Sequence, residues 1–110
     1  SKFNTAPELY PEGKKTLSTK VIDTISWLKL LHKNYPKLYK EISEITLSNE
    51  DEINLILDNQ ATKVILGNKN TLEKLKILQR FKELVIEKNK ITDIAYLDIR
   101  YENQIIVKEN

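Results

Sequence analysis

The chain has 110 residues, of which 40% are hydrophobic, so it is long enough for one globular domain with a modest core. Charged residues nearly balance at a net charge of +2, which does not favour a nucleic-acid-binding protein. Cysteine is absent, and this excludes disulfides, thiol nucleophiles and cysteine-type zinc sites. No apolar run approaches the roughly 20 residues of a membrane helix, and no signal peptide is recognisable.

The N-terminal part divides into an arm and a helix. We expect residues 1–16 to form an extended arm or loop, because they hold two prolines and a glycine and show little periodicity. Ser18 is suited to cap a helix that ends near Tyr35, because Pro36 disfavours helical conformation at the residue before it. The apolar face predicted for this helix consists of Val21, Ile25, Leu28, Leu31 and Tyr35, widened by Ile22, Trp27 and Leu30. A short helical turn around Leu38 should then lead into a sheet.

Three short apolar segments predict three strands, at residues 42–47, 53–57 and 63–66. In the second strand Ile53, Leu55 and Leu57 share one face, which is the face expected to be buried. Residues 58–60 are expected to form a hairpin loop. Gly67 ends the third strand at a position where we expect a left-handed or tight backbone conformation.

A second helix is expected from Asn70 to about Asn89. Asn70 followed by Glu73 resembles a capping box with Asn in place of Ser or Thr. Its predicted buried stripe consists of apolar residues at helical spacing: Leu72, Leu75, Leu78, Phe81 and Leu84 or Val85. Its predicted solvated flank consists of charged residues: Lys74, Lys76, Arg80, Lys82 and Glu83. Contact of this flank with an anionic partner is the alternative.

Two strands joined by a turn are expected to close the chain. Residues 95–101 alternate between apolar and polar, which is typical of a half-buried strand. Residues 102–103 are a turn pair, because Asn tolerates positive φ. Residues 105–107 form a second strand in which Ile106 faces the opposite way from its two neighbours. Such a closing strand is expected at a sheet edge, where unpaired N–H and C=O groups can pair with another chain.

These elements give the order α-β-β-β-α-β-β. We therefore expect residues 17–110 to form a single α+β domain. Its sheet should be mostly antiparallel, with two helices packed on one face and the C-terminal strand at the edge.

Three segments together resemble the C-terminal β-domain of the FtsQ/DivIB family of bacterial cell-division proteins. Lys63-Val-Ile-Leu-Gly67 is similar to the family's strand-then-glycine signature. The leucines from Leu72 to Leu78, with Phe81, are similar to the helix that follows. Tyr96-Leu-Asp-Ile-Arg-Tyr101 is similar to the family's Tyr-Val-Asp-Leu-Arg-Tyr strand. The resemblance covers about residues 17–108.

The resemblance implies a non-enzymatic role in the divisome during septum formation. Family members are single-pass inner-membrane proteins whose POTRA domain and β-domain lie on the outer, periplasmic side. They recruit two small coiled-coil division proteins, FtsB (DivIC) and FtsL, and a segment of FtsB adds as a strand to the last β-strand. The chain would then be a β-domain fragment without the membrane helix or the POTRA domain. It would need no cofactor or metal, bind no nucleic acid and insert into no membrane.

By position, the resemblance assigns partner binding to the turn and the last strand: Tyr101, Asn103, Gln104, Ile105, Ile106, Val107 and Lys108. Three places depart from the family. Gln104 stands where many members have glycine, and Glu109 stands where some have an aromatic residue. Residues 50–52 are acidic where some members are basic.

Each candidate also has a plainer interpretation. Tyr101 is either an interface hot spot or a half-buried sheet aromatic. Asp98 and Arg100 are expected to form a surface ion pair worth about 0–1 kcal/mol rather than a catalytic pair. Residues 50–52 are expected to be a solvated loop, with weak calcium binding as the alternative. His32 has no companion at metal-ligand spacing.

Two other functions are the alternatives for the whole chain. One is a generic POTRA-like α+β interaction domain, self-associating through the same edge. The other is a small hydrolase or nucleic-acid-binding domain. It is disfavoured because two glycines make a phosphate-binding loop improbable and no serine elbow or enzymatic carboxylate pair is present.

Overall fold

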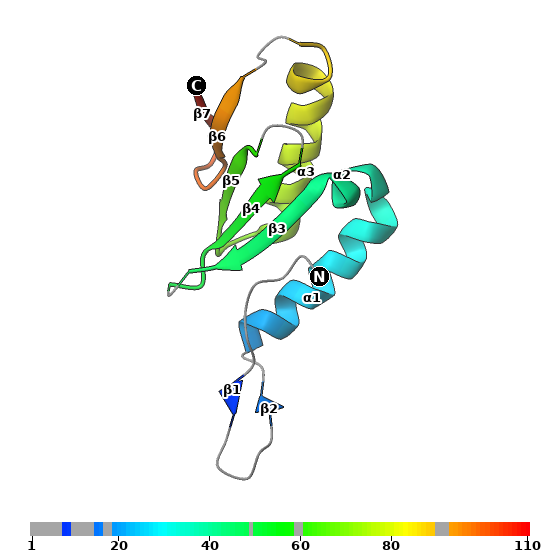
Figure 1. Cartoon of the computed structure of the whole chain (residues 1–110), viewed down its shortest axis with the longest axis vertical. Coiled ribbons are helices and arrows are strands. Elements are labelled where there is room, and N and C mark those ends of the chain that lie inside the picture. Colours follow the sequence, from blue (N-terminus) through cyan, green and yellow to red (C-terminus); the bar gives the residue numbers. More distant parts are fainter. Residues whose placement is uncertain (1–7, 10–14, 17–18, 49, 59–60, 90–92) are drawn as a thin grey trace.

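The computed structural model describes residues 8–9, 15–16, 19–48, 50–58, 61–89 and 93–110 (Figure 1). Its helices are α1 (Thr19–Asn34), α2 (Pro36–Glu41) and α3 (Thr71–Phe81), and α3 continues into a π-helical turn, η1 (Lys82–Ile86). Its longer strands are β3 (Ile42–Leu47), β4 (Ile53–Leu57), β5 (Lys63–Gly67), β6 (Ile94–Asp98) and β7 (Ile106–Glu109). None of the helices in the described ranges is long and apolar enough to cross a membrane.

Five strands form one sheet in the order β3-β4-β5-β6-β7. All neighbours are antiparallel except β5 and β6, which are parallel. A parallel pair needs a crossover connection, and α3 with η1 supplies it. The helices lie along one side of the sheet (Figure 1). The predicted α+β fold with a mostly antiparallel sheet is therefore confirmed.

The core lies between the helices and one face of the sheet. β4 alternates as predicted, with Ile53, Leu55 and Leu57 buried and the residues between them partly exposed. Together with apolar side chains of the other elements they form one cluster: Trp27, Leu31, Leu38, Ile42, Ile45, Val64, Leu66, Leu75, Leu78, Ile94, Leu97 and Ile99. A chain of this length is expected to have one modest core, and the single contiguous cluster agrees with that expectation.

The apolar face predicted for the first helix is only partly correct. α1 buries Thr24, Trp27 and Leu31, whereas Ile25 and Leu30 are exposed. The three buried positions are three and four residues apart, so they form one narrow stripe that meets the sheet. The wider apolar face that the sequence pattern predicts is therefore not buried as a whole.

The pattern predicted for the second helix is wrong at three places. Leu72 is 44% exposed, whereas Lys74 and Lys82, expected on the solvated flank, are buried. Of the two alternatives at the end of the stripe, Leu84 is exposed and Val85 is half-buried. The predicted capping box is also absent. Asn70 has a left-handed backbone (φ 53°) and makes no side-chain capping bond. A residue that caps through its side chain normally has an extended backbone, so this conformation takes the Asn70 side chain out of position.

The predicted arm contains one described feature, a short antiparallel pairing of β1 (Glu8–Leu9) with β2 (Lys15–Thr16). Figure 1 shows this pair beyond the start of α1, apart from the five-stranded sheet. The predicted cap at Ser18 and the loop residues Asn59 and Gln60 lie outside the described residues.

Candidate functional site

The last strand, β7, lies at one end of the five-stranded sheet, beside β6. The structure spreads the seven predicted partner-binding residues over three places. Tyr101 and Asn103 lie in the turn after β6, and Asn103 has the positive φ (60°) that its residue type allows. Gln104 and Ile105 connect this turn to the strand. Residues 106–108 lie within β7 itself.

The hydrogen-bond pattern of the sheet shows which backbone groups of β6 face β7. The N–H of Ile99 donates to the carbonyl of Ile65 on β5, at 3.0 Å. The N–H groups of successive residues in a strand point to opposite sides, so the backbone of Leu97 also faces β5. The backbones of Tyr96 and Asp98 therefore face β7.

The pairing register of β6 with β7 then shows which backbone groups of β7 face β6. Asp98 lies opposite Ile106, and Tyr96 lies opposite Lys108, so the backbones of these two β7 residues point inward. At the end of the strand the N–H of Asn110 donates to the carbonyl of Asp93 at 2.9 Å, which continues the same alternation. The backbones of Val107 and Glu109 thus point outward, to an edge at which the described part of the chain places no further strand.

The side chains of β7 alternate between the two faces as predicted. Ile105 and Val107 are half-buried and pack against the core cluster. Ile106 is on the other face and is 41% exposed. The sequence predicts this alternation of side chains, but it does not predict which β7 residues point their backbone N–H and C=O groups outward.

Tyr101 lies in the turn rather than in the strand. β6 ends at Asp98, and the Tyr101 side chain is 45% exposed. The guanidinium carbon of Arg100 lies 5.4 Å from the centre of the Tyr101 ring, which is within the range of a cation–π contact. An exposed aromatic side chain next to an open strand edge is a suitable anchor for a partner.

The expected surface ion pair between Asp98 and Arg100 is present, but its acid is buried. Asp98 is 5% exposed, and its carboxylate accepts bonds from Nε and Nη2 of Arg100 at 2.9 and 2.7 Å. The backbone N–H of Arg100 donates to the same carboxylate at 3.1 Å. The alternation of apolar and polar residues along this strand did not predict the burial of Asp98.

This pair gives a pH-dependent contribution to stability. Hydrogen bonds from the Arg100 side chain hold the pKa of Asp98 below its usual value, although burial acts in the opposite direction. Because the pKa is lower in the folded protein, the stabilisation is complete above about pH 4 and is lost as the pH falls through the folded-state pKa. We expect Asp98→Asn to lower the free energy of unfolding by about 1–3 kcal/mol at pH 7. Urea denaturation should show this difference shrinking as the pH falls below about 4; a difference independent of pH would contradict it.

The acidic loop before β4 is folded rather than free. The Ser48 hydroxyl accepts the N–H groups of Glu50 and Glu52, at 3.2 and 3.1 Å. Glu52 lies 3.4 Å from the Arg100 guanidinium, so this part of the loop adds a second carboxylate to the Asp98–Arg100 pair. Within the described residues, no three His, Cys, Asp or Glu side chains gather where they could hold a metal ion.

Gly67 provides space for Arg100. Its φ is +82°, as its place at the end of the third predicted strand indicated, and an added Cβ would lie 3.0 Å from Cγ of Arg100. We expect Gly67→Ala to lower the free energy of unfolding by about 1–2 kcal/mol, through backbone strain and this contact. Ala61→Gly is the matched control, because Ala61 also has positive φ (53°) and the change should raise stability by about 0.5 kcal/mol. Urea denaturation measures the change in the free energy of unfolding of both variants. An unchanged midpoint for Gly67→Ala would contradict the expected destabilisation.

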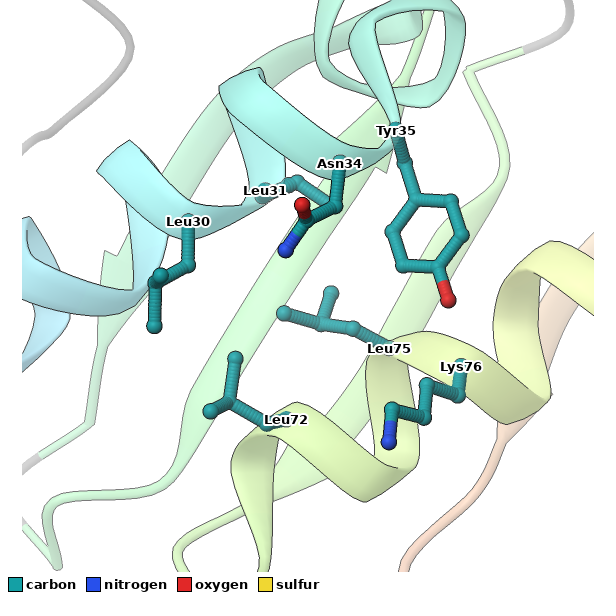
Figure 2. Close-up of a pocket in the computed structure, with 7 residues that line it drawn as sticks. All are labelled: Leu30, Leu31, Asn34, Tyr35, Leu72, Leu75 and Lys76. Carbon is teal, nitrogen blue, oxygen red and sulfur yellow. The ribbon is translucent and has the colours of Figure 1, made fainter.

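A pocket of about 250 Å³ lies between α1 and α3. Figure 2 shows Leu30 of α1 facing Leu72 and Leu75 of α3, with Tyr35 and Lys76 together on one side of the pocket. Its lining explains why Leu72 is exposed, because this side chain borders an open pocket instead of a neighbouring element. The pocket is on the helical side of the molecule, and β7 is at the far edge of the sheet (Figure 1).

A comparison with protein families gives one match. The family model described as the C-terminal part of the cell division protein FtsQ/DivIB matches residues 2–100. The match covers most of the chain and ends just before Tyr101 and β7. No curated protein matches the chain.

Proposed function

The chain belongs to the FtsQ/DivIB family of cell-division proteins, through the family's C-terminal domain, and we propose that it acts as a non-enzymatic scaffold that captures a partner strand at β7. The observation that carries this proposal is the open edge. The backbones of Val107 and Glu109 point away from β6, beside an exposed Ile106. An extended segment can add there as a sixth strand, with main-chain bonds for affinity and neighbouring side chains for specificity.

The resemblance names the partner. We propose that the strand comes from the FtsB (DivIC) protein, which acts together with FtsL. The interaction would take place on the outer side of the bacterial inner membrane. Self-association through the same edge is the competing function.

A titration tests the proposal. The ¹⁵N-labelled protein is mixed with the extracytoplasmic segment of the same organism's FtsB-like protein, and backbone amide shifts are followed. We expect saturable shifts centred on residues 101–108. The same shifts on raising the concentration of the protein alone, with dimer formation in light scattering, would support self-association instead.

Tyr101→Ala should weaken this binding by about tenfold, because an exposed aromatic side chain at the edge of the new strand loses its contact. Tyr39→Ala is the control. Tyr39 is half-buried on α2 and contacts the His32 ring edge-on, with 4.7 Å between ring centres, so its truncation should lower stability and leave affinity unchanged. Equal affinity losses in the two variants would contradict a local role for Tyr101.

A further inference from the structure

Lys74 is a buried lysine that the sequence pattern places in solvent. It lies in the first part of α3, and its side chain is almost completely covered. Burying an ammonium group is costly unless polar partners replace its water. The Lys74 ammonium donates to the backbone carbonyl of Arg100 at 3.1 Å, and its charge also favours the ionised form of Asp98.

Arg100 is therefore held from two directions. Asp98 fixes its N–H and its guanidinium, and Lys74 fixes its carbonyl. The next residue is Tyr101, and the chain then turns and enters β7 at Ile106. The carbonyl of Arg100 is thus the last backbone group that the described contacts with α3 hold before the turn.

We propose that Lys74 is a positioning residue for the docking edge: it fixes the backbone from which Tyr101 projects and β7 begins. This inference rests on the proposed function for its effect on partner binding, but its effect on β7 does not need a partner. Without the Lys74 bond, the Asp98–Arg100 contacts still hold the side chain of Arg100. The peptide unit after it is then free to rotate, and with it the direction of Tyr101 and the pairing of Ile106 with Asp98.

The helix offers a matched control. Lys82, near the other end of the same helical segment, is as buried as Lys74, but it pairs with Glu41, at the junction of α2 and β3. Lys82→Met removes a buried lysine that has no contact with the turn into β7. Lys74→Met removes the buried lysine that holds the Arg100 carbonyl before this turn.

The first readout is amide hydrogen exchange of the free protein. In Lys74→Met we expect protection of the Ile106 and Lys108 amides to fall about tenfold, relative to core amides such as Leu55. In Lys82→Met the ratio should stay as in the wild type. Lys74→Arg keeps the positive charge and the N–H donors, so the Ile106 and Lys108 amides should keep most of their wild-type protection. If Lys74→Met does not fold, Lys74→Gln, which keeps an N–H donor on a shorter side chain, takes its place.

The second readout is affinity for the FtsB-like segment, which we expect to fall about tenfold in Lys74→Met and to be unchanged in Lys82→Met. A folded Lys74→Met protein with wild-type protection of Ile106 and Lys108 would overturn the inference, whatever its affinity. Loss of that protection in a protein whose wild-type form binds no partner would uphold the positioning role and overturn the proposed function.

Discussion

Val107→Pro is expected to weaken partner binding by about 2–3 kcal/mol, or roughly 30- to 150-fold, while the domain stays folded. Proline has no N–H, so the change removes an outward donor of β7, and its ring takes up space that the added strand would use. Proline is tolerated on an edge strand where the lost N–H faces solvent, and Val107 meets this condition. The measurement is calorimetric titration with the FtsB-like segment, alongside urea denaturation.

Two variants make this prediction specific. Val107→Thr keeps the N–H and the branched shape, so affinity should stay within about threefold of the wild type. Ile106→Pro removes an inward N–H that faces Asp98, so it should lower stability as well as binding. Wild-type affinity in a folded Val107→Pro protein would refute strand addition at this edge.

Glu41→Ala is expected to destabilise the protein by about 2–4 kcal/mol. The ammonium of Lys82 is buried and contacts the Glu41 carboxylate, which is itself partly exposed. Removing the acid leaves an unpaired charge in the interior, and this costs more than the pair contributes. Urea denaturation at pH 7 gives the size of the loss.

The reverse substitution should be much milder. Lys82→Met replaces the lysine with an apolar side chain of similar length, and the carboxylate left behind can be hydrated because a quarter of its side chain is exposed. We expect a loss of less than about 1.5 kcal/mol. Equal losses for Glu41→Ala and Lys82→Met would contradict this asymmetry.

The two buried lysines also show where sequence reasoning ends. Helical periodicity correctly placed Leu75 and Leu78 in the core of α3. It put Lys74 and Lys82 in solvent, because a charged residue beside an apolar stripe usually lies there. What buries them are groups distant in the sequence, such as the carbonyl of Arg100, and no local pattern contains that information.

The strands were easier to predict than the helix faces. The sheet buries one face of β4 along its whole length, so the alternation of Ile53, Leu55 and Leu57 is sufficient to assign it. α1 buries only a narrow stripe, so the apolar face that the sequence predicts is wider than the buried one. Leu30 stays exposed where it borders the pocket between α1 and α3, and Ile25 is exposed as well.

The candidate site was predicted in part. The position of β7 at an edge followed from its place at the end of the order of strands, and the family resemblance named its residues. The direction of each N–H did not follow, because it depends on the parallel pairing of β5 with β6. The bond from Ile99 to Ile65 fixes that pairing, and through it the outward direction of Val107.

Amide hydrogen exchange at β7, with and without the FtsB-like segment, tests the central claim most directly. In the free protein the Val107 and Glu109 amides should exchange fast, and those of Ile106 and Lys108 should exchange slowly. With saturating partner, Val107 and Glu109 should become protected as they donate to the new strand. Binding that leaves Val107 and Glu109 unprotected would show that the partner docks elsewhere on the domain and that β7 is not the docking edge.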